Sequence, residues 1–391
     1  MASASDLDAW LTRELAKIRT TTPSSQPGFV LGVVVWGAGY IDRLARICLP
    51  TLMTPANAAG LRALNSRLLV YTRAEDFVRI WREVAQLEQL GIPVQFGYIP
   101  NELLEVPKAA IRAGDKKQHI YAALGTAQSL MVQQAGWSGS GFHMLMPDHC
   151  YSERFFAVVA DMVEKRDGVA QGAIAMGAVS ASIETAGAEL DACRHADGSL
   201  RIAARQLGDL AWRHLHQQTK AVLLDGQALE TLPRSNVMLW RGKDALHLAG
   251  PFGNPVWMSP QLCRFAPIVA PTTLDAELPA LMPGGFLLPR PEDDMVCVEF
   301  SDEEKGAPST GGRTDFVQMN QMQMNFNEAY LPLMRARTLI PTEDCFDGLD
   351  EETIDRHQAA LLELIQEGRV AAMERFMHYM LTANRQLRRS L

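Results

Sequence analysis

One short stretch of the chain, Phe142 to Glu153, carries the residue types that could do chemistry. It reads FHMLMPDHCYSE, so an acid and an imidazole, Asp148 and His149, directly follow an apolar run that Pro147 ends. In open α/β sheets, ligands bind in the crevice outside the carboxyl ends of the strands. The pattern therefore predicts a ligand or metal site at the end of a buried strand. An alternative interpretation is that Asp148 caps a helix beginning near Tyr151, as aspartate often does.

Two further carboxylates follow apolar or extended segments and could join that site. Asp302 comes directly after the apolar run MVCVEF, Met295 to Phe300, and Asp275 stands in TTLDAEL. Carboxylates that converge on one edge of a sheet can take a proton from a nucleophile or hold a cation. The alternative is that Asp275 is a turn acid before Glu277 and that Asp302 is a solvated acid beside Glu303.

A pair of glycines, Gly37 and Gly39, ends the first strongly apolar run and invites comparison with dinucleotide-binding turns. In such turns, glycines let backbone amides approach a pyrophosphate at the start of a helix. Asp42 occupies the position of the third glycine, and its carboxylate opposes a pyrophosphate. We therefore expect the glycines to form a close turn near a nucleotide that is not a nicotinamide cofactor. A nicotinamide-dependent oxidoreductase is the less favoured alternative.

Alternating strand and helix patterns supply the frame for these residues. Four largely apolar runs have the character of central parallel strands that are buried on both faces. Helical spacing of apolar residues lies between them, as at Ala74 to Leu90 and Lys117 to Ala135. This order predicts an α/β fold, a mostly parallel sheet with helices on both faces. The predicted strands are Phe29 to Trp36, Ser66 to Thr72, Pro93 to Ile99 and Phe142 to Met146.

The remaining segments predict one large domain with appended parts. A chain of 391 residues exceeds the ~250–300 residues of one usual core. We expect a leading helix and linker over residues 1–27 and the α/β domain over 28–305, with a helical insertion near 183–230. Residues 306–391 are expected to form a loop and a helical C-terminal part. Its apolar helical spacing from Asp350 to Leu387 favours packing or a face through which two copies pair.

Composition argues against several classes of protein. The formal net charge is -8 and no long basic run precedes the terminal RQLRRSL, so nucleic acid is a poor partner. No apolar window approaches the ~18 residues of a transmembrane segment, and the N-terminus lacks a signal-peptide core. The six cysteines lack the tight spacing of a zinc site or disulfide framework. These features predict a cytoplasmic protein with reduced thiols.

Taken in order, several short motifs resemble those of GT-A-like bacterial glycosyltransferases from surface-glycan and flagellar gene neighbourhoods. They are a WG-x-x-Y opening, an L-P-x-L-x-x-P-x-N turn, a P-D at the fourth strand, a histidine-proline segment, a T-x-D and an S-D-E. In this chain they stand in WGAGYIDRLARICLPTLMTPANAAGL, LMPDHCYSERFF, HLAGPFGNPVWMSP, TTLDAEL and EFSDEE, with RLLVYTRAED between the first two. The resemblance covers roughly residues 30 to 305.

The resemblance implies a GT-A-like, Rossmann-like fold that transfers a sugar from a nucleotide-sugar donor to a glycan or protein acceptor. Asp148 stands where such folds usually keep a D-x-D acid, although Pro147-Asp148-His149 is not that motif. Asp148 and His149 are then the implied ligands of magnesium or manganese, with donor phosphates in the other positions. The implied catalytic carboxylates are Asp148, Asp275 and Asp302. The implied donor-binding residues are Trp36, Gly37, Gly39, Tyr40, Thr72 and His247.

A second interpretation keeps the fold but not the reaction. The sequence shows no strong, fully spaced set of metal ligands, so the chain could be a non-catalytic nucleotide-sugar-binding or scaffold protein. Turnover of the donor distinguishes the two, because only an enzyme hydrolyses or transfers the sugar.

Overall fold

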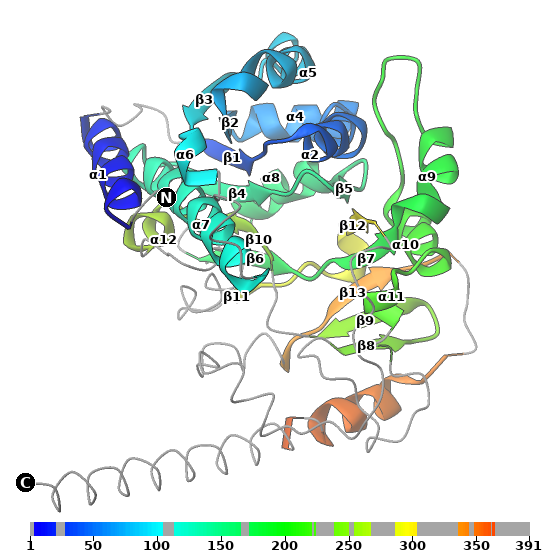
Figure 1. Cartoon of the computed structure of the whole chain (residues 1–391). Helices are drawn as coiled ribbons and strands as arrows, with labels where there is room; N and C mark the ends of the chain where they lie inside the picture. Colours follow the sequence, from blue (N-terminus) through cyan, green and yellow to red (C-terminus); the bar gives the residue numbers. More distant parts are fainter. Residues whose placement is uncertain are drawn as a thin grey trace, which may run out of the picture.

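The main element of the computed structural model is a seven-stranded mixed sheet, with strand order β11-β6-β10-β4-β1-β2-β3 (Figure 1). The structure describes residues 4–20, 28–104, 113–165, 172–220, 223, 238–249, 254–266, 286–302, 335–343, 348–360 and 362–363. The strands of this sheet are β1 (Phe29–Val34), β2 (Ser66–Thr72), β3 (Val94–Tyr98), β4 (Gly141–Leu145), β6 (Ala173–Met176), β10 (Asn254–Met258) and β11 (Phe286–Leu287).

The four predicted strands are confirmed as four neighbouring parallel strands of this sheet. β1 lies between β2 and β4, with Phe29 beside Ser66 on one side and beside Gly141 on the other. β3 continues the parallel arrangement beyond β2, whereas β10 runs antiparallel to β4 and to β6. Chain order therefore reverses at β1, since β2 and β3 lie on one side of it and β4 on the other. Doubly wound sheets reverse their strand order in the same way.

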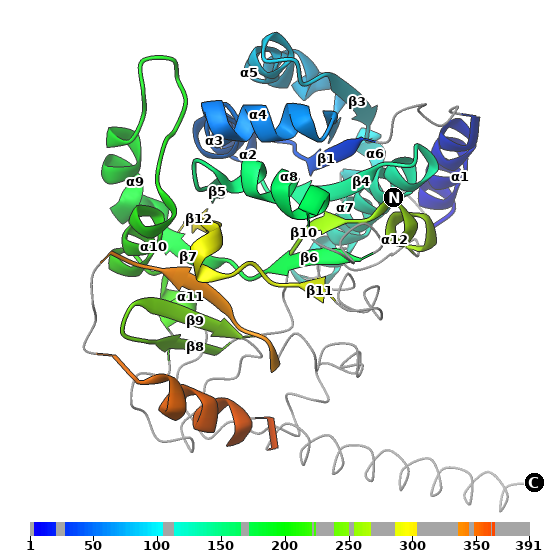
Figure 2. The same ribbon diagram turned by 180° about the vertical axis from the view of Figure 1, so that it is seen from behind.

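Helices cover both faces of the sheet, as predicted. The side chains of β1 alternate between the faces, so Phe29, Leu31 and Val33 belong to one core and Val30 to the other. The first face carries α2 (Ala38–Arg43), η1 (Leu44–Cys48), α3 (Leu49–Leu52), α4 (Pro55–Ala63), α5 (Phe77–Gln89) and α8 (Phe155–Lys165). The second carries α1 (Ala4–Thr20), α6 (Asn101–Leu104), α7 (Ala113–Trp137) and α12 (Pro260–Phe265), as Figures 1 and 2 show.

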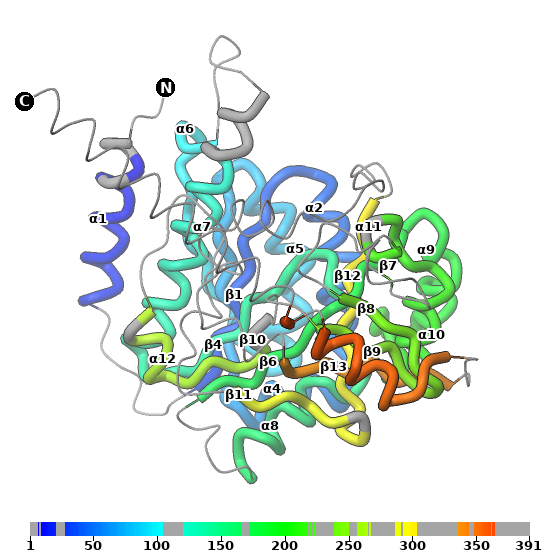
Figure 3. The backbone as a smooth tube through the Cα atoms, turned by 90° about the horizontal axis from the view of Figure 1, so that it is seen from below, coloured from blue at the N-terminus to red at the C-terminus, as the bar shows by residue number. Residues whose placement is uncertain are grey.

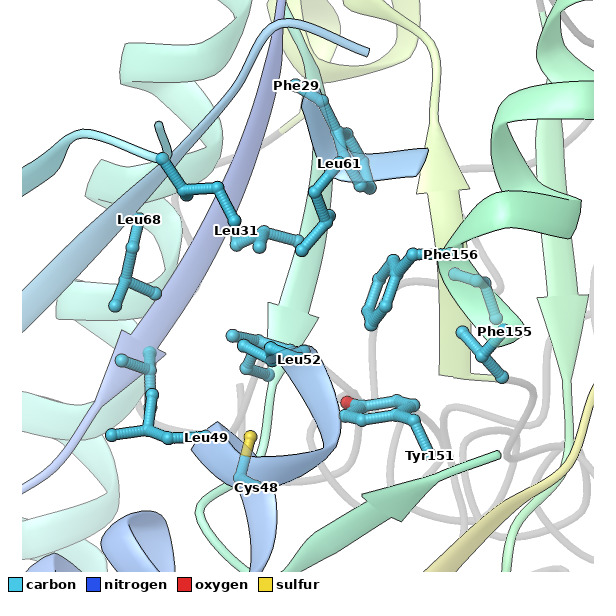
Figure 4. Packing of buried hydrophobic residues seen from close by; sticks show 14 of the residues in the cluster. Phe29, Leu31, Cys48, Leu49, Leu52, Leu61, Leu68, Tyr151, Phe155 and Phe156 are labelled. Carbon is cyan, nitrogen blue, oxygen red and sulfur yellow. The ribbon is translucent and has the colours of Figure 1, made fainter. Parts of the chain in front are cut away.

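The core of the first face joins β1 to the short helices that follow it. Leu52 and Leu61 pack with Leu31, and the aromatic rings of Tyr151 and Phe156 close the same cluster (Figure 4). Burying one large apolar side chain of this kind stabilises the fold by about 1.5–3 kcal/mol. These contacts fix the helices of the first face relative to the carboxyl ends of the strands.

Glycine permits the closest helix contact of this face. A Cβ atom on Gly60 of α4 would lie 2.4 Å from the backbone oxygen of Phe156 in α8. The two helices can therefore pack backbone against backbone only because this position has no side chain.

A helical run after β1 changes its winding just beyond Arg43. α2 ends at Arg43, the π-helical turn η1 follows, and α3 continues the run to Leu52. Single π-helical turns within helices occur frequently at functional sites. Leu44 and Cys48 of the turn are buried in the core, which fixes the end of α2 and so the position of Arg43.

Two smaller sheets extend the molecule beyond the carboxyl ends of the main strands. The first has the order β5-β12-β7 and the second the order β13-β9-β8. Their strands are β5 (His149–Tyr151), β7 (Val179–Ser182), β8 (Met238–Arg241), β9 (Ala245–Ala249), β12 (Cys297–Ser301) and β13 (Thr338–Pro341). A second core, with Val298, Leu246 and Ile340 among its buried residues, joins the two sheets. Figure 3 shows the β13-β9-β8 sheet on the side of the molecule away from α1 and α12.

The insertion predicted near residues 183–230 contains three helices within its described part. They are α9 (Ile183–Ala192), α10 (Ala204–Arg213) and α11 (Gln217–Lys220). Leu190, Leu207 and Leu210 from these helices pack into the second core. None of the helices within the described ranges is long and apolar enough to cross a membrane.

Two predicted elements differ from the structure. The helix predicted from Tyr151 begins only at Phe155, because His149 to Tyr151 pair with β12 as strand β5. The C-terminal part, predicted as loop and helix, contains strand β13, in which Leu339 lies beside His247 of β9. Residues 351–360 are helical, as predicted, and most of the remaining predicted helix lies outside the described residues.

Candidate functional site

A pocket of about 490 Å³ lies at the carboxyl ends of β1 and β4, where the strand order reverses. Crevices at such reversals are the usual ligand sites of open α/β sheets, and this volume falls within the ~300–1,000 Å³ of small-molecule pockets. Trp36, Tyr40 and Tyr121 give the lining an aromatic character. Its polar lining residues are Gln128, Asp148, His149 and Glu299.

Four of the residues implied by the sequence resemblance line this pocket. Trp36 follows β1 and Tyr40 lies in α2, while Asp148 and His149 follow β4. The interpretation of Asp148 as a helix cap is wrong, because α8 begins at Phe155 and β5 lies between them. Instead, the carboxylate of Asp148 lies 3.9 Å from the guanidinium of Arg43.

Arg43, which sequence reasoning missed, connects two of the predicted carboxylates. Its Nη2 donates a hydrogen bond to Asp302, and its Nη1 lies 3.9 Å from Oδ2 of Asp148. Its guanidinium carbon lies 5.4 Å from the centre of the Tyr40 ring. The side chain of Asp148 is only 10% exposed, whereas that of Asp302 is 44% exposed, so solvent screens the second ion pair more strongly.

Only a weak signal in the sequence could have identified Arg43. It directly follows Asp42, which drew attention as a substitute for a glycine. In the structure, Asp42 forms an ion pair with Arg79 at the surface, whereas Arg43 contacts the pocket residues Asp148 and Tyr40. Asp42 and Arg43 are therefore neighbours on one helix, but the first contacts the protein surface and the second contacts the pocket.

Backbone hydrogen bonds hold the turn that carries Asp148. The Phe300 amide donates to the Asp148 carbonyl oxygen over 2.9 Å, which fixes this turn to β12. Beyond β5, Asn57 Nδ2 donates to the Ser152 carbonyl over 3.0 Å, and the Phe156 amide donates to Asn57 Oδ1 over 2.8 Å. Asn57 is the last residue of the L-P-x-L-x-x-P-x-N motif, so this motif fixes the chain that follows the site.

A second carboxylate, Glu299 of β12, lines the pocket beside the predicted residues. Glu299 lies beside His149 in the antiparallel register of β12 and β5. Ser180 Oγ donates to its Oε2 over 3.0 Å, and Ser301 Oγ donates to its other oxygen. The signal in the sequence was a single charged residue within the otherwise apolar run MVCVEF.

The predicted metal ligands lie together but do not form a complete metal site. Asp148 and His149 both line the pocket, and the Asp148 carboxylate also faces the Arg43 guanidinium. Within the described ranges, no group of three or more histidine, cysteine, aspartate or glutamate side chains could hold a metal ion. Magnesium usually takes one or two carboxylates together with phosphates and waters. The chemistry of these donors therefore fits an ion that binds together with phosphates.

The two predicted glycines have different surroundings. Gly37 adopts φ 77° and ψ 150°, and its amide donates to Asp76 Oδ2 over 2.9 Å. Arg73 also donates to this carboxylate, so the turn after β1 is tied to the turn after β2. Gly39 lies within α2, and a Cβ atom there would meet no atom of the described residues within 4 Å. The backbone thus requires glycine at position 37, and the fold itself gives no such requirement at position 39.

Gly37→Ala is expected to lower the free energy of unfolding by about 1–3 kcal/mol, because its φ and ψ angles are open essentially only to glycine. Gly39→Ala is the matched control and should stabilise the protein by about 0.4–1 kcal/mol, because alanine fits the helix. Urea denaturation of both variants measures the difference. Equal effects at the two positions would contradict the assignment of the turn.

The other residues implied by the resemblance lie elsewhere or outside the described ranges. Thr72 ends β2 and is buried, and its hydroxyl has no hydrogen-bond partner among the described residues. His247 lies in β9 of the β13-β9-β8 sheet, where its Nδ1 is 3.9 Å from Glu351 Oε2. Asp275 lies outside the described residues. Neither Thr72 nor His247 is among the described residues that line the pocket.

Replacing His247 by glutamine is expected to reduce the loss of stability at acidic pH. Burial lowers the pKa of His247 below its usual 6.5, although the nearby Glu351 carboxylate opposes this shift. The unfolded chain therefore binds a proton at a pH where the folded chain does not. The contribution of neutral His247 to the free energy of unfolding is fully present above the pKa of ~6.5 that this residue has in the unfolded chain. It is lost as the pH falls from there towards the pKa of His247 in the folded chain.

Urea denaturation at about pH 7 and about pH 5 measures this effect. The wild type should lose more unfolding free energy over that interval than His247→Gln. His195→Gln replaces an exposed histidine and should behave as the wild type. Identical pH dependence in the wild type and His247→Gln would show that His247 does not contribute.

Buried thiols and a buried phenol lie next to the site. Burial raises the pKa values of Cys48, Cys150 and Cys297, and that of Tyr151 rises well above its usual 10.0 for the same reason. The Tyr151 hydroxyl also lies 3.1 Å from His143 Nε2. These thiols are therefore protonated at neutral pH and act as packing groups rather than nucleophiles.

The site is thus an aromatic pocket that brings together two carboxylates, an imidazole and, through Asp148, an arginine. Such a set can bind a polyhydroxylated or phosphorylated ligand and can accept a proton. In comparisons of the sequence with protein-family models and with curated proteins, no family and no protein matches the chain.

Proposed function

We propose that this protein is a nucleotide-sugar-dependent glycosyltransferase with a GT-A-like catalytic domain. It moves a sugar from the donor to a glycan or protein acceptor in bacterial surface or flagellar glycosylation. The observation that carries the proposal is the pocket beside Asp148, which lies where the strand order of a mostly parallel sheet reverses. The ordered motifs of the sequence support the same family.

The proposed reaction is a displacement at the anomeric carbon of the donor. The bond between this carbon and the phosphate oxygen breaks, and its electron pair leaves with the nucleoside diphosphate. A bond to the acceptor oxygen forms, and the acceptor proton passes to a carboxylate. Asp148 and Glu299 are the carboxylates that line the described part of the pocket, and either can accept this proton.

Positive charge must stabilise the departing phosphates, and the proposal gives two sources of this charge. Arg43 contacts the pocket residues Asp148 and Tyr40 and supplies a permanent charge beside the pocket. Asp148 and His149 are the proposed ligands of a magnesium or manganese ion, which when bound adds further charge at the phosphates. Arg43 holds the Asp148 carboxylate on one side, so this residue orients the proposed ligand as well.

A melting-shift screen of nucleotide diphosphate sugars, with magnesium and with a chelator, tests donor binding. A ligand at ~100 times its dissociation constant should raise the free energy of unfolding by about 2.7 kcal/mol. Release of nucleoside diphosphate from the stabilising donor then tests turnover. The proposal fails if no nucleotide sugar stabilises the protein under either condition.

A non-catalytic nucleotide-sugar-binding or scaffold protein is the second candidate. It is favoured by the contacts of Asp148 and Asp302 with the same arginine, since structural ion-pair networks have this form. Stabilisation by a donor that is never hydrolysed or transferred would support this candidate. Turnover at any rate above the background would exclude it.

We also propose a cytoplasmic location and self-association. Five cysteines in the described part of the chain are free, which agrees with a reducing compartment. The helical spacing from Asp350 to Leu387 supports a homodimer through the C-terminal helices. Light scattering of the full chain, and of a chain ending at residue 363, tests the second proposal, because only the full chain should form dimers.

A further inference from the structure

Exposed apolar side chains gather on one part of the molecular surface, where helix α5 lies beside strand β3 (Figure 1). Phe77, Val78 and Trp81 of α5 are 40%, 57% and 38% exposed, and Tyr98 of β3 is 46% exposed. Residues 77 and 78 precede residue 81 by about one helical turn, so the three side chains share one side of α5. β3 is the last strand of the seven-stranded sheet. This surface therefore lies at the edge of the sheet.

Phe96 of β3 supports the aromatic rings of this surface. Its ring centre lies 4.6 Å from that of Phe77 and 6.0 Å from that of Trp81. The rings of Phe77 and Trp81 are nearly parallel, with an angle of 10° between their planes. Tyr98 is on the same face of β3 as Phe96, because strand side chains alternate. We call Phe77, Val78, Trp81, Phe96 and Tyr98 the aromatic surface; exposed apolar surface of this kind marks sites at which proteins bind.

The chain itself contains a segment with complementary chemistry, in residues 364–391, which lie outside the described ranges. Met373, Phe376, Met377 and Met380 recur at the three- and four-residue spacing of one helix face. Methionine is flexible, and its sulfur makes favourable contacts with aromatic rings. The segment also carries five arginines and two glutamates, whereas the whole chain has a formal net charge of -8. Two such segments therefore repel each other, and each is attracted to the acidic remainder of a chain.

The segment starts at the end of the molecule opposite to the aromatic surface. The helical residues 351–360 lie at the lower end of Figures 1 and 2, whereas α5 lies at the upper end. Met373 and Met380 follow Glu363, the last described residue, by 10 and 17 positions, which is about 15–25 Å of helix. A folded chain of this length measures roughly 55 Å across. The methionines of a second copy, rather than those of the same chain, can therefore meet the aromatic surface.

We propose that the aromatic surface of one copy binds the C-terminal segment, residues 364–391, of a second copy. This inference rests on the proposed self-association and names the surface that takes part in it. Each chain supplies one surface and one segment, so two copies exchange their segments and form a closed dimer. The methionine face of the segment packs on the rings of Phe77 and Trp81, as amphipathic helices pack on apolar surfaces of their partners.

Substitutions in the full chain test the surface. Trp81→Ser should raise the dissociation constant of the dimer about 1,000-fold, because an aromatic hot spot contributes a factor of about 30 at each of two contacts. Val78→Asp should act in the same direction and leaves the packed rings intact. Trp137→Ser replaces a tryptophan of equal exposure, 38%, at the end of α7 and should dimerise as the wild type. Light scattering over a series of concentrations measures all four proteins.

The outcomes separate this inference from the proposals on which it rests. If Trp81→Ser and Val78→Asp dimerise as the wild type does, the inference is overturned and self-association through the C-terminal helices stands. If the wild type stays monomeric at every concentration, both fail, and the proposed sugar transfer is not affected. Weaker dimers in Trp81→Ser and Val78→Asp but not in Trp137→Ser support the inference.

Photo-crosslinking identifies the two partners directly. A photoreactive phenylalanine analogue at position 376 is placed in ordinary and in ¹⁵N-labelled full chains, which are then mixed in equal amounts. Cross-links should join the segment of one isotopic form to a peptide of α5 or β3 of the other form. Cross-links that occur only within one isotopic form, or only between two C-terminal segments, overturn the inference.

Discussion

Arg43→Ala is expected to eliminate stabilisation by the donor and to lower the free energy of unfolding by about 2–3 kcal/mol. The substitution removes the guanidinium that faces the Asp148 carboxylate and donates to Asp302. Asp148 is buried, so losing a charged neighbour is costly there. Asp302 is 44% exposed, and water can replace most of its contact.

Two further variants separate charge from geometry. Arg43→Lys keeps the charge but not the planar fork that reaches both carboxylates, so it should restore donor binding only in part. Arg46→Ala lies in the same helical run and removes an exposed ion pair with Asp191, so its effect should stay below about 1 kcal/mol. Melting curves with and without donor measure both quantities. Normal stabilisation of Arg43→Ala by the donor would remove Arg43 from the site.

Asp148→Asn is expected to slow donor turnover about 100-fold or more while the protein stays folded. Loss of one electrostatic contact that acts in the transition state typically costs ~10²–10³ in rate. Asparagine keeps the size and the hydrogen-bonding oxygen but cannot carry the charge that faces Arg43 or accept a proton. A helix-capping contribution does not complicate the result, because α8 begins at Phe155. Release of nucleoside diphosphate under saturating donor measures the rate.

Controls for Asp148→Asn come from carboxylates in other surroundings. Asp161→Asn removes an exposed partner of Lys165 on α8 and should not change turnover. Asp302→Asn should have a smaller effect than Asp148→Asn, because its side chain is more exposed and the pocket lining does not include it. Unchanged turnover in Asp148→Asn would remove this carboxylate from the reaction and favour the non-catalytic candidate.

Local patterns were sufficient to predict the parallel part of the sheet. β1, β2 and β4 are largely apolar runs, because helices cover both faces of these central strands and most of their side chains are buried. β3 lies at the edge of the sheet and is more exposed. The predicted start of α8 near Tyr151 was wrong. The local pattern from His149 to Tyr151 does not distinguish a helix from a strand, and only pairing with β12 makes these residues a strand. Strand β13 was missed for the same reason, since its partner β9 lies far away in the sequence.

The strand that ends at the site and the residues next to its end could be predicted from residue order, because apolar runs and the residues that stop them are local properties. Trp36, Tyr40, Asp148 and His149 line one pocket because they follow or flank the ends of two neighbouring strands. Only the folded structure shows that Arg43 contacts Asp302, which is 259 positions away, and that Glu299 lines the same pocket. It also put His247 in the β13-β9-β8 sheet beside Glu351. These contacts depend on how distant segments pack against one another, and residue spacing within a single segment carries no information about that packing.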